Sequence, residues 1–249
     1  MTCMQAQALS APETLQAGSF DEAVQTLSDR VLAANPTQSA ASRWVIGISG
    51  VPGSGKSTIA KAVAAHLNEL QKDQHFAVAV GMDGFHYTRA QLDGMEDPEE
   101  AHAKRGAHWT FNGPSFVKAI SELKQAVHSK LPSFDHNVKD PVEDDIEVLE
   151  HHQVVIVEGN YLHLDLDPWN QLASLWDDSW YLDCDMEVAM QRVFDRFLTM
   201  GLCSHEAQHR LDDNDSRNAE LIASYAHCAQ LIIKCAVDAA ADEAMKAEE

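Results

Sequence analysis

Basic residues are scarce in this chain of 249 residues. It carries 18 lysines and arginines against 39 aspartates and glutamates, a formal net charge of −21 at pH 7. A surface this acidic attracts neither the phosphate backbone of a nucleic acid nor an anionic membrane. We therefore expect no nucleic-acid partner and no membrane partner, and the positions of the few basic residues become informative.

Cysteines and long apolar runs are scarce as well. The five cysteines contain no CxxC pair, so we expect reduced thiols and neither a disulfide framework nor a cysteine-based metal site. Thirteen histidines are scattered without an HxxxH or HExxH spacing, so a zinc site is not expected. There is no run of about 18 apolar residues to predict a membrane span. The N-terminal sequence lacks the pattern of a signal or transit peptide, and we expect a cytoplasmic protein.

A phosphate-binding loop is the clearest motif that is present. The sequence GVPGSGKS at Gly50–Ser57 matches the pattern G-x-x-x-x-G-K-[ST]. The apolar run Trp44–Ile48 before it predicts a buried strand, and apolar residues at helical spacing over Thr58–Leu70 predict a helix after it. Backbone amides at a helix N-terminus form an anion site, here for the phosphates of a nucleotide.

Two side chains of this loop carry specific predictions. Lys56 places a charge near the β- and γ-phosphates, and the Ser57 hydroxyl is a candidate Mg²⁺ ligand. The sequence therefore predicts that the chain binds a nucleoside triphosphate together with Mg²⁺. The predicted ATP-binding residues are Gly50, Val51, Pro52, Gly53, Ser54, Gly55, Lys56, Ser57 and Thr58.

The rest of the chain alternates apolar runs with helical patterns. Ser19 and Glu22 form a capping-box pattern before an amphipathic helix that stops at Asn35-Pro36. Further strands are predicted at Phe76–Met82, Val154–Val157, Ser179–Leu182 and Leu231–Ile233, with a less certain one at Ile146–Leu149. Such alternation indicates an α/β fold in which a mainly parallel sheet has helices on both faces. The stretch Gly84–Gly113 is too long for an ordinary connection, which indicates a functional segment.

Acidic residues follow three of the predicted strands. Asp83 is placed to accept a hydroxyl proton from a phosphate acceptor, or simply caps the next turn. Glu158 closes an apolar strand at the position of a carboxylate that holds Mg²⁺, or is a solvated strand-end residue. We interpret Asp183 as structural.

Arg192 and Arg196 lie four residues apart on one face of the predicted helix Met186–Thr199. Paired guanidinium groups are suited to holding a phosphoryl group during its transfer. The alternative is a set of ion pairs along the helix with Glu187 and Asp195.

These segments together resemble the uridine kinase, phosphoribulokinase and pantothenate kinase family, with the closest similarity to its small sugar-directed and uncharacterised branch. The resemblance spans roughly residues 44–233. It is carried, in this order, by GISGVPGSGKST, MDGFHY, RGAHWTFN, FDHNVKDPVEDDI, VVIVEGNYL and the helix with Arg192 and Arg196.

The resemblance implies a three-layer P-loop fold, with residues 41–237 as the kinase domain and about 186–217 as a helical lid. Residues 1–40 become an N-terminal extension with one helix, and 238–249 an acidic helix or tail. Asp83 becomes the catalytic base, and the two lid arginines become phosphate contacts. The residues implied for the acceptor side are His86, Tyr87, Arg105, His136, Glu158 and Tyr161, while Arg210 and the Asn214-Asp215 pair resemble a segment near the nucleotide.

Two residues depart from the family pattern. Asn112 stands where an aspartate is usual, and His108 stands where a proline is common. These departures leave the acceptor open.

We therefore predict an ATP-dependent kinase that phosphorylates a hydroxyl group of a small metabolite such as a sugar or sugar acid. A nucleoside kinase of the uridine type, a pantothenate kinase and, in a different class, a nucleotide-binding regulatory ATPase are the alternatives. The oligomeric state is left open, with a homodimer as one alternative.

Overall fold

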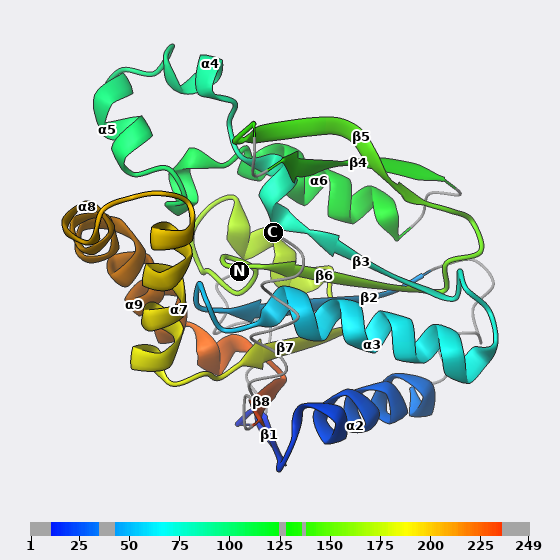
Figure 1. The fold of residues 1–249 in the computed structure, drawn as a ribbon. Coiled ribbons are helices and arrows are strands. Elements are labelled where there is room, and N and C mark those ends of the chain that lie inside the picture. Colours follow the sequence, from blue (N-terminus) through cyan, green and yellow to red (C-terminus); the bar gives the residue numbers. More distant parts are fainter. Residues whose placement is uncertain (1–10, 35–42, 125–127, 136–137, 236–249) are drawn as a thin grey trace.

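A six-stranded, all-parallel sheet forms the centre of the molecule (Figure 1). The computed structural model describes residues 11–34, 43–124, 128–135 and 138–235. The strand order is β1-β8-β7-β2-β6-β3, so the strand that leads into the phosphate loop lies inside the sheet. The strands are β1 (Glu13–Ala17), β2 (Trp44–Gly50), β3 (Ala77–Gly81), β6 (Val154–Gly159), β7 (Asp178–Leu182) and β8 (Leu231–Cys235).

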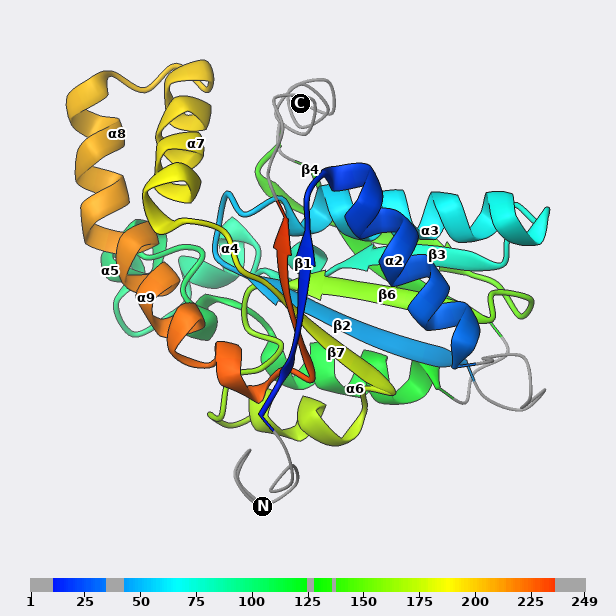
Figure 2. The ribbon, with the colours of Figure 1, turned by 90° about the horizontal axis from the view of Figure 1, so that it is seen from below.

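Helices cover both faces of this sheet, which confirms the predicted fold class (Figure 2). Helices α2 (Phe20–Ala33) and α3 (Lys56–Gln71) lie on one face, and α6 (Gly113–Leu123) and the 3₁₀ helix η4 (Trp169–Ser174) lie on the other. Because side chains alternate along a strand, Val45 joins the core under α6 while Ile46 and Ile48 join the core under α3. A strand buried on both faces has the continuous apolar sequence that predicted it.

The N-terminal segment contains a strand that the sequence did not predict. Strand β1 pairs in parallel with β8 at the edge of the sheet. Helix α2 begins after the predicted cap, where the Ser19 hydroxyl accepts a hydrogen bond from the Glu22 amide at 3.2 Å. The prediction of an N-terminal extension with one helix therefore misses Glu13–Ala17, where β1 adds an edge strand to the sheet.

We expected an irregular stretch over Gly84–Gly113. The structure instead shows four short helices between Met82 and Thr110. These are η2 (Met82–Phe85), α4 (Arg89–Leu92), α5 (Pro98–Ala103) and η3 (His108–Thr110). Each is too short to show a helical apolar period, which is why the sequence pattern misses them.

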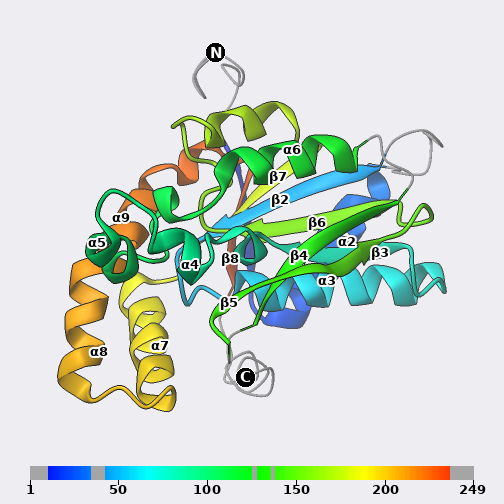
Figure 3. The same cartoon turned by 90° about the horizontal axis from the view of Figure 1, so that it is seen from above.

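An antiparallel hairpin packs against η2, near the β3 edge of the sheet (Figure 3). Its strands are β4 (Ser129–Asp135) and β5 (Asp140–Val148), of which the sequence predicted only the end of β5. The contact is close, since a Cβ atom on Gly84 would lie 2.0 Å from the Pro132 carbonyl oxygen. His136, one of the predicted acceptor residues, lies outside the described residues.

The remaining helices gather at the carboxyl end of the sheet (Figures 1 and 2). They are α7 (Met186–Thr199), α8 (Ser204–Arg210), the π-helical turn η5 (Leu211–Asp215), α9 (Ser216–Ser224) and η6 (Ala226–Cys228). Helix α7 has the predicted bounds, whereas the π-helical turn was not predicted. The predicted acidic tail 238–249 lies outside the described residues.

Two further observations concern the composition. Cys184, Cys203 and Cys235 carry free thiols, but Cys228 is disulfide-bonded, so the expectation of reduced cysteines is wrong for Cys228.

Within the described residues, none of the helices combines the length and the apolar character that crossing a membrane requires.

Candidate active site

The phosphate loop connects β2 to α3 through two glycines in left-handed conformations. Gly53 has φ of 77° and Gly55 has φ of 89°, a region that disfavours side chains. The two positions differ in their surroundings. A Cβ atom on Gly53 would lie 2.2 Å from the Ala189 carbonyl oxygen of α7, whereas one on Gly55 would have no heavy atom within 4 Å. The loop therefore packs against α7 on one side and leaves space at the N-terminus of α3, the place where an anion binds.

Ser57 and Glu158 meet beside this loop. The Ser57 hydroxyl hydrogen-bonds the Glu158 carboxylate, and the positive charge of Lys56 and the negative charge of Asp83 both act on that carboxylate. Burial raises the pKa of Glu158 and the Asp83 carboxylate adds to the rise, while Lys56 and the Ser57 hydrogen bond oppose it. The structure thus brings together four predicted site residues that come from three different elements.

Strand register explains how Glu158 reaches this place. Glu158 lies between Ile48 of β2 and Gly81 of β3. A Cβ atom on Gly81 would lie 3.1 Å from Glu158 Oε1, so glycine leaves room for the carboxylate.

The donor atoms of this pair fit a magnesium ion. A hydroxyl and a carboxylate are hard oxygen ligands, and Mg²⁺ bound with a nucleotide takes few protein ligands because phosphates and waters supply the rest. The described residues hold no group of three or more histidine, cysteine or acidic side chains that could bind a metal by themselves. Ser57 and Glu158 are the residues that would hold Mg²⁺.

Asp83 lies in η2, directly after β3. The backbone amide of His86 donates to the Asp83 carbonyl at 3.1 Å, and His86 Nδ1 lies 2.8 Å from the same oxygen. The His86 ring also contacts the Phe111 ring, with centroids 3.8 Å apart. These contacts fix the turn that carries the Asp83 side chain.

Arg105 and Tyr87 lie together behind this turn. Arg105 donates from Nη2 to the Tyr87 carbonyl and to Asp140 Oδ1, both at 2.8 Å, and from Nη1 to the Lys139 carbonyl. The guanidinium therefore joins the segment after β3 to the β4–β5 hairpin, and its charge is paired with Asp140.

Tyr161 is only 1% exposed and follows β6. Its hydroxyl donates to the Gly106 carbonyl at 2.6 Å, and its ring contacts Phe111 and Trp169. Burial and the negative charges of Asp215 and Asp83 raise its pKa. Tyr161 therefore ties the turn after β6 to the segment at residues 104–106 through its hydrogen bond to the Gly106 carbonyl.

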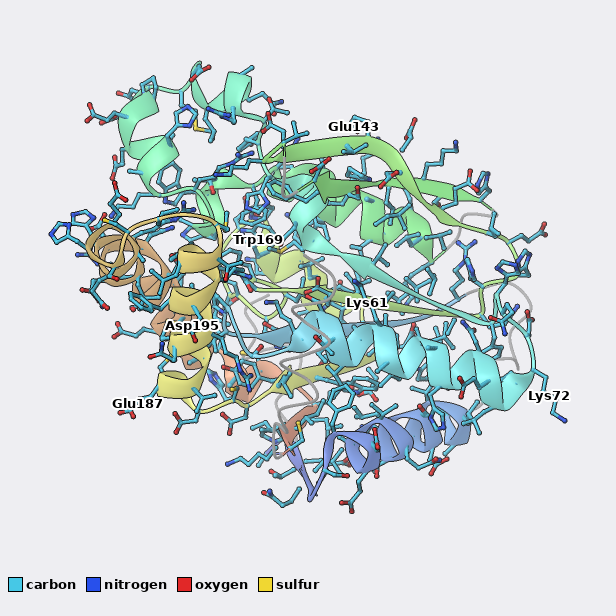
Figure 4. All side chains as sticks on the ribbon, in the orientation of Figure 1. Lys61, Lys72, Glu143, Trp169, Glu187 and Asp195 are labelled. Atoms are coloured by element: carbon cyan, nitrogen blue, oxygen red, sulfur yellow. The ribbon has the colours of Figure 1, made fainter. Side chains whose placement is uncertain are left out.

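The two arginines of α7 differ in their surroundings. Arg192 Nη1 donates to the Gly53 carbonyl at 3.2 Å, which points this guanidinium at the phosphate loop. The charge of Arg196 acts on Asp215 of the π-helical turn. Asp195, the acid considered as an ion-pair partner, accepts instead from Gln191 Nε2 at 2.9 Å (Figure 4).

The turn η5 contains Asn214 and Asp215, which the resemblance relates to a segment near the nucleotide. The Asn214 amide donates to the Arg105 carbonyl at 3.0 Å, and Lys104 pairs with the Asp213 carboxylate. In the sequence, this turn is visible only as the polar run DDND, which has no apolar period. The structure places that run against residues 104–106.

A phosphate loop between a central parallel strand and a helix, with one carboxylate at the end of β6 and another directly after β3, and arginines on a covering helix, defines a P-loop kinase. A family model for the "Phosphoribulokinase / Uridine kinase family" matches residues 45–199, and the chain belongs to this family of ATP-dependent P-loop kinases.

Individual relatives agree with this assignment. A Schizosaccharomyces pombe protein named "Putative uridine kinase C227.14" is 41% identical over 184 residues, which cover 72% of this chain and 78% of that protein. The crystal structure titled as a putative fructose transport system kinase from Silicibacter sp. TM1040 has a TM-score of 0.76 at 32% identity and covers 84% of this chain and 98% of that one. YFH7 from Saccharomyces cerevisiae shares the fold, with a TM-score of 0.72 at 21% identity over 86% of this chain and 99% of that one.

Proposed function

We propose that this protein transfers the γ-phosphoryl group of ATP to a hydroxyl group of a small metabolite. The observation that carries the proposal is the convergence of Lys56, Ser57, Glu158 and Asp83 at the open N-terminus of α3. The names of two relatives, a uridine kinase and a fructose transport system kinase, support a small acceptor that bears hydroxyl groups.

Each residue has a role in this reaction. The amides of the loop bind the phosphates, and the Lys56 ammonium neutralises charge on the phosphoryl group. Bound at Ser57 and Glu158, Mg²⁺ would supply further neutralisation of that charge. Arg192, held beside the loop by the Gly53 carbonyl, adds a positive charge from the lid, and Arg196 lies one helical turn further along the same helix.

Asp83 acts on the acceptor. A bond forms between the acceptor oxygen and the γ-phosphorus as the bond from that phosphorus to the β,γ-bridging oxygen breaks, and ADP leaves with the bridging oxygen. The acceptor hydroxyl gives its proton to the Asp83 carboxylate. Because the transition state of phosphoryl transfer is loose, positioning and electrostatics provide most of the rate enhancement.

The test is a substrate screen with two variants. The protein with Mg·ATP is incubated with sugars, sugar acids, nucleosides and pantothenate, and phosphorylated products are identified by mass spectrometry. We expect stoichiometric product from one class, and we expect Asp83→Asn to lose turnover by about 100-fold or more while it retains ATP affinity. Asp93→Asn, at an exposed position of the same segment, is the control. ATP hydrolysis that no acceptor stimulates would favour a regulatory ATPase instead.

A further inference from the structure

We propose that Asn160 is a further residue of the acceptor site, where its side-chain amide binds a hydroxyl group of the acceptor. This inference rests on the proposed kinase function and adds to it a residue to which the sequence motifs gave no role. Asn160 directly follows the inner strand β6, two residues after Glu158 and one residue before Tyr161. In open parallel sheets, ligands bind beyond the carboxyl ends of the strands, which is where Asn160 lies.

The backbone of Asn160 is fixed beside the start of the phosphate loop. Ser49 of β2 is in register with Gly159 of β6, and the Ser49 hydroxyl donates to the Asn160 carbonyl at 2.9 Å. Ser49 is only 1% exposed, and the next residue along the chain is Gly50, the first of the phosphate loop. A buried hydrogen bond therefore holds Asn160 next to this loop.

The same turn contacts the segment that carries Asp83. A Cβ atom on Gly159 would lie 2.6 Å from the Met82 Cβ atom, and Met82 is the residue before Asp83. The turn after β6 therefore lies between the phosphate loop and the residue that we assign as the base. The acceptor has to bind in this region, because its hydroxyl must reach both the γ-phosphorus and the base.

The side-chain amide of Asn160 is incompletely paired. Its Oδ1 atom is buried and has no hydrogen-bond partner within residues 11–34, 43–124, 128–135 and 138–235. The residue as a whole is partly exposed, so a bound compound can reach this amide. A buried polar atom without a partner is costly, and a ligand that pairs with it removes that cost.

A hydroxyl group suits this amide better than a phosphate does. The side-chain oxygen of asparagine accepts hydrogen bonds and its nitrogen donates them, whereas a hydroxyl does both. A hydroxyl therefore satisfies the amide whichever of its two ends faces the ligand. The phosphate oxygens of ATP only accept, and the loop amides and Lys56 are the donors assigned to them. The ligand of Asn160 is accordingly the acceptor and not the nucleotide.

The test replaces asparagine by leucine, which has nearly the same shape but no polar atoms, at two positions. Asn160→Leu removes the unpaired amide. Asn68→Leu, in α3, is the matched control, because the Asn68 amide is paired at both ends. Asn68 Oδ1 accepts from the Ala77 amide at 2.7 Å, and Asn68 Nδ2 donates to the Ala77 carbonyl at 3.1 Å. Thermal unfolding is measured without ligands, and KM values are measured with Mg·ATP and fructose, D-glycerate, uridine or pantothenate.

We expect the two variants to have opposite effects. Asn160→Leu should raise the KM of the phosphorylated acceptor about 10-fold or more, leave the KM for ATP within about twofold, and keep or raise the unfolding temperature. Asn68→Leu should lower the unfolding temperature by about 4 °C or more and leave both KM values unchanged. Loss of acceptor binding without loss of stability distinguishes a ligand-binding asparagine from a structural one.

A second variant, Asn160→Ala, removes the amide without filling its place and should raise the acceptor KM to a similar extent if leucine prevents folding. An unchanged acceptor KM in either folded variant would overturn the inference, and so would a rise confined to the KM for ATP. A lower unfolding temperature together with equal rises in both KM values would mark Asn160 as a structural residue. If the unchanged protein phosphorylates none of the acceptors, the proposed kinase function is rejected and the inference with it.

Discussion

Arg192 of α7 donates a hydrogen bond to the Gly53 carbonyl of the phosphate loop, at 3.2 Å. The contact joins α7 to the loop. Gly53 is also the residue whose missing Cβ lets α7 approach, since that atom would lie 2.2 Å from the Ala189 carbonyl oxygen. Helix α7 and the phosphate loop are therefore packed as one unit at this point.

Replacement of Gly53 by alanine should separate this unit. The new methyl group would clash with the Ala189 carbonyl, and the alanine backbone would have to keep a left-handed φ of 77°. We therefore expect the free energy of unfolding to fall by about 2 kcal/mol or more. Gly55→Ala is the matched control, because its φ is equally unfavourable but its surroundings are open. Thermal unfolding should show the larger decrease for Gly53→Ala. Equal decreases would mean that the contact with α7 has no energetic weight.

Lys56 is the loop residue whose charge should matter most for catalysis. We expect Lys56→Ala to lower the rate of phosphoryl transfer at least about 100-fold, because a fixed positive charge beside the phosphates is lost. Lys118→Ala changes an exposed lysine of α6 and serves as control, with a rate within about twofold of the unchanged protein. Product formation in single-turnover experiments distinguishes the two. A comparable loss in both variants would point to a general effect of the protein's charge.

The sequence predicted those parts of the site that are contiguous or lie at strand ends. The phosphate loop is one contiguous motif. Strand β6, which carries Glu158, is an inner strand with a continuous apolar run, and the apolar strand β3 directly precedes the turn with Asp83. The N-terminal strand β1 was missed because Glu13–Ala17 is a short edge strand without a continuous apolar run. Asp215 was predicted to lie near the nucleotide only through the resemblance, because a π-helical turn has no sequence period and the neighbouring residues 104–106 are distant in the chain.

The resemblance implied Arg105 and Tyr161 as residues of the acceptor side, and the structure shows which groups they contact. Arg105 hydrogen-bonds Asp140 and the carbonyls of Tyr87 and Lys139, and Tyr161 hydrogen-bonds the Gly106 carbonyl. Such contacts depend on the hairpin β4–β5, which the sequence revealed only in part. Their roles toward an acceptor stay predictions.

Glu158 should make the stability of the nucleotide-free protein depend on pH. Burial and Asp83 raise its folded-state pKa above its ordinary value of 4.5, so the folded state binds the proton more tightly than the unfolded state. As pH rises from about 4.5 through the folded-state pKa, unfolding releases this proton and stability falls by about 1.4 kcal/mol for each unit between the two pKa values.

Glu158→Gln removes this penalty because glutamine does not ionise. Without nucleotide and Mg²⁺, we expect the unfolding temperature of Glu158→Gln to exceed that of the unchanged protein by a margin that grows as pH rises above 4.5. The same variant should lose Mg²⁺-dependent phosphoryl transfer. Glu143→Gln, at an exposed position on β5, is the control (Figure 4). A margin that does not change with pH would contradict the assignment of a buried, proton-binding carboxylate.

Arg30 of α2 joins two strands of the sheet, β1 and β7. Its Nε donates to Asp178 Oδ2 at 2.7 Å, at the start of β7, and its Nη1 donates to Glu13 Oε2 at 2.6 Å, at the start of β1. The Asp178 side chain is only 10% exposed, whereas that of Glu13 is 69% exposed. The partner that matters for stability is therefore Asp178, since an exposed ion pair contributes little.

Arg30→Gln should lower the free energy of unfolding by about 1–3 kcal/mol, because it leaves the Asp178 carboxylate buried without its cation. The double variant Arg30→Gln/Asp178→Asn should recover part of this loss, since an amide replaces the unpaired charge. Lys118→Gln breaks an exposed ion pair with Glu122 and should change stability by less than about 0.5 kcal/mol. Chemical denaturation of the four proteins measures these differences. If the single variant is as stable as Lys118→Gln, or the double variant is the least stable of all, then the backbone pairing of β1 with β8 and the apolar contacts of α2 hold this segment without help from the Arg30–Asp178 ion pair.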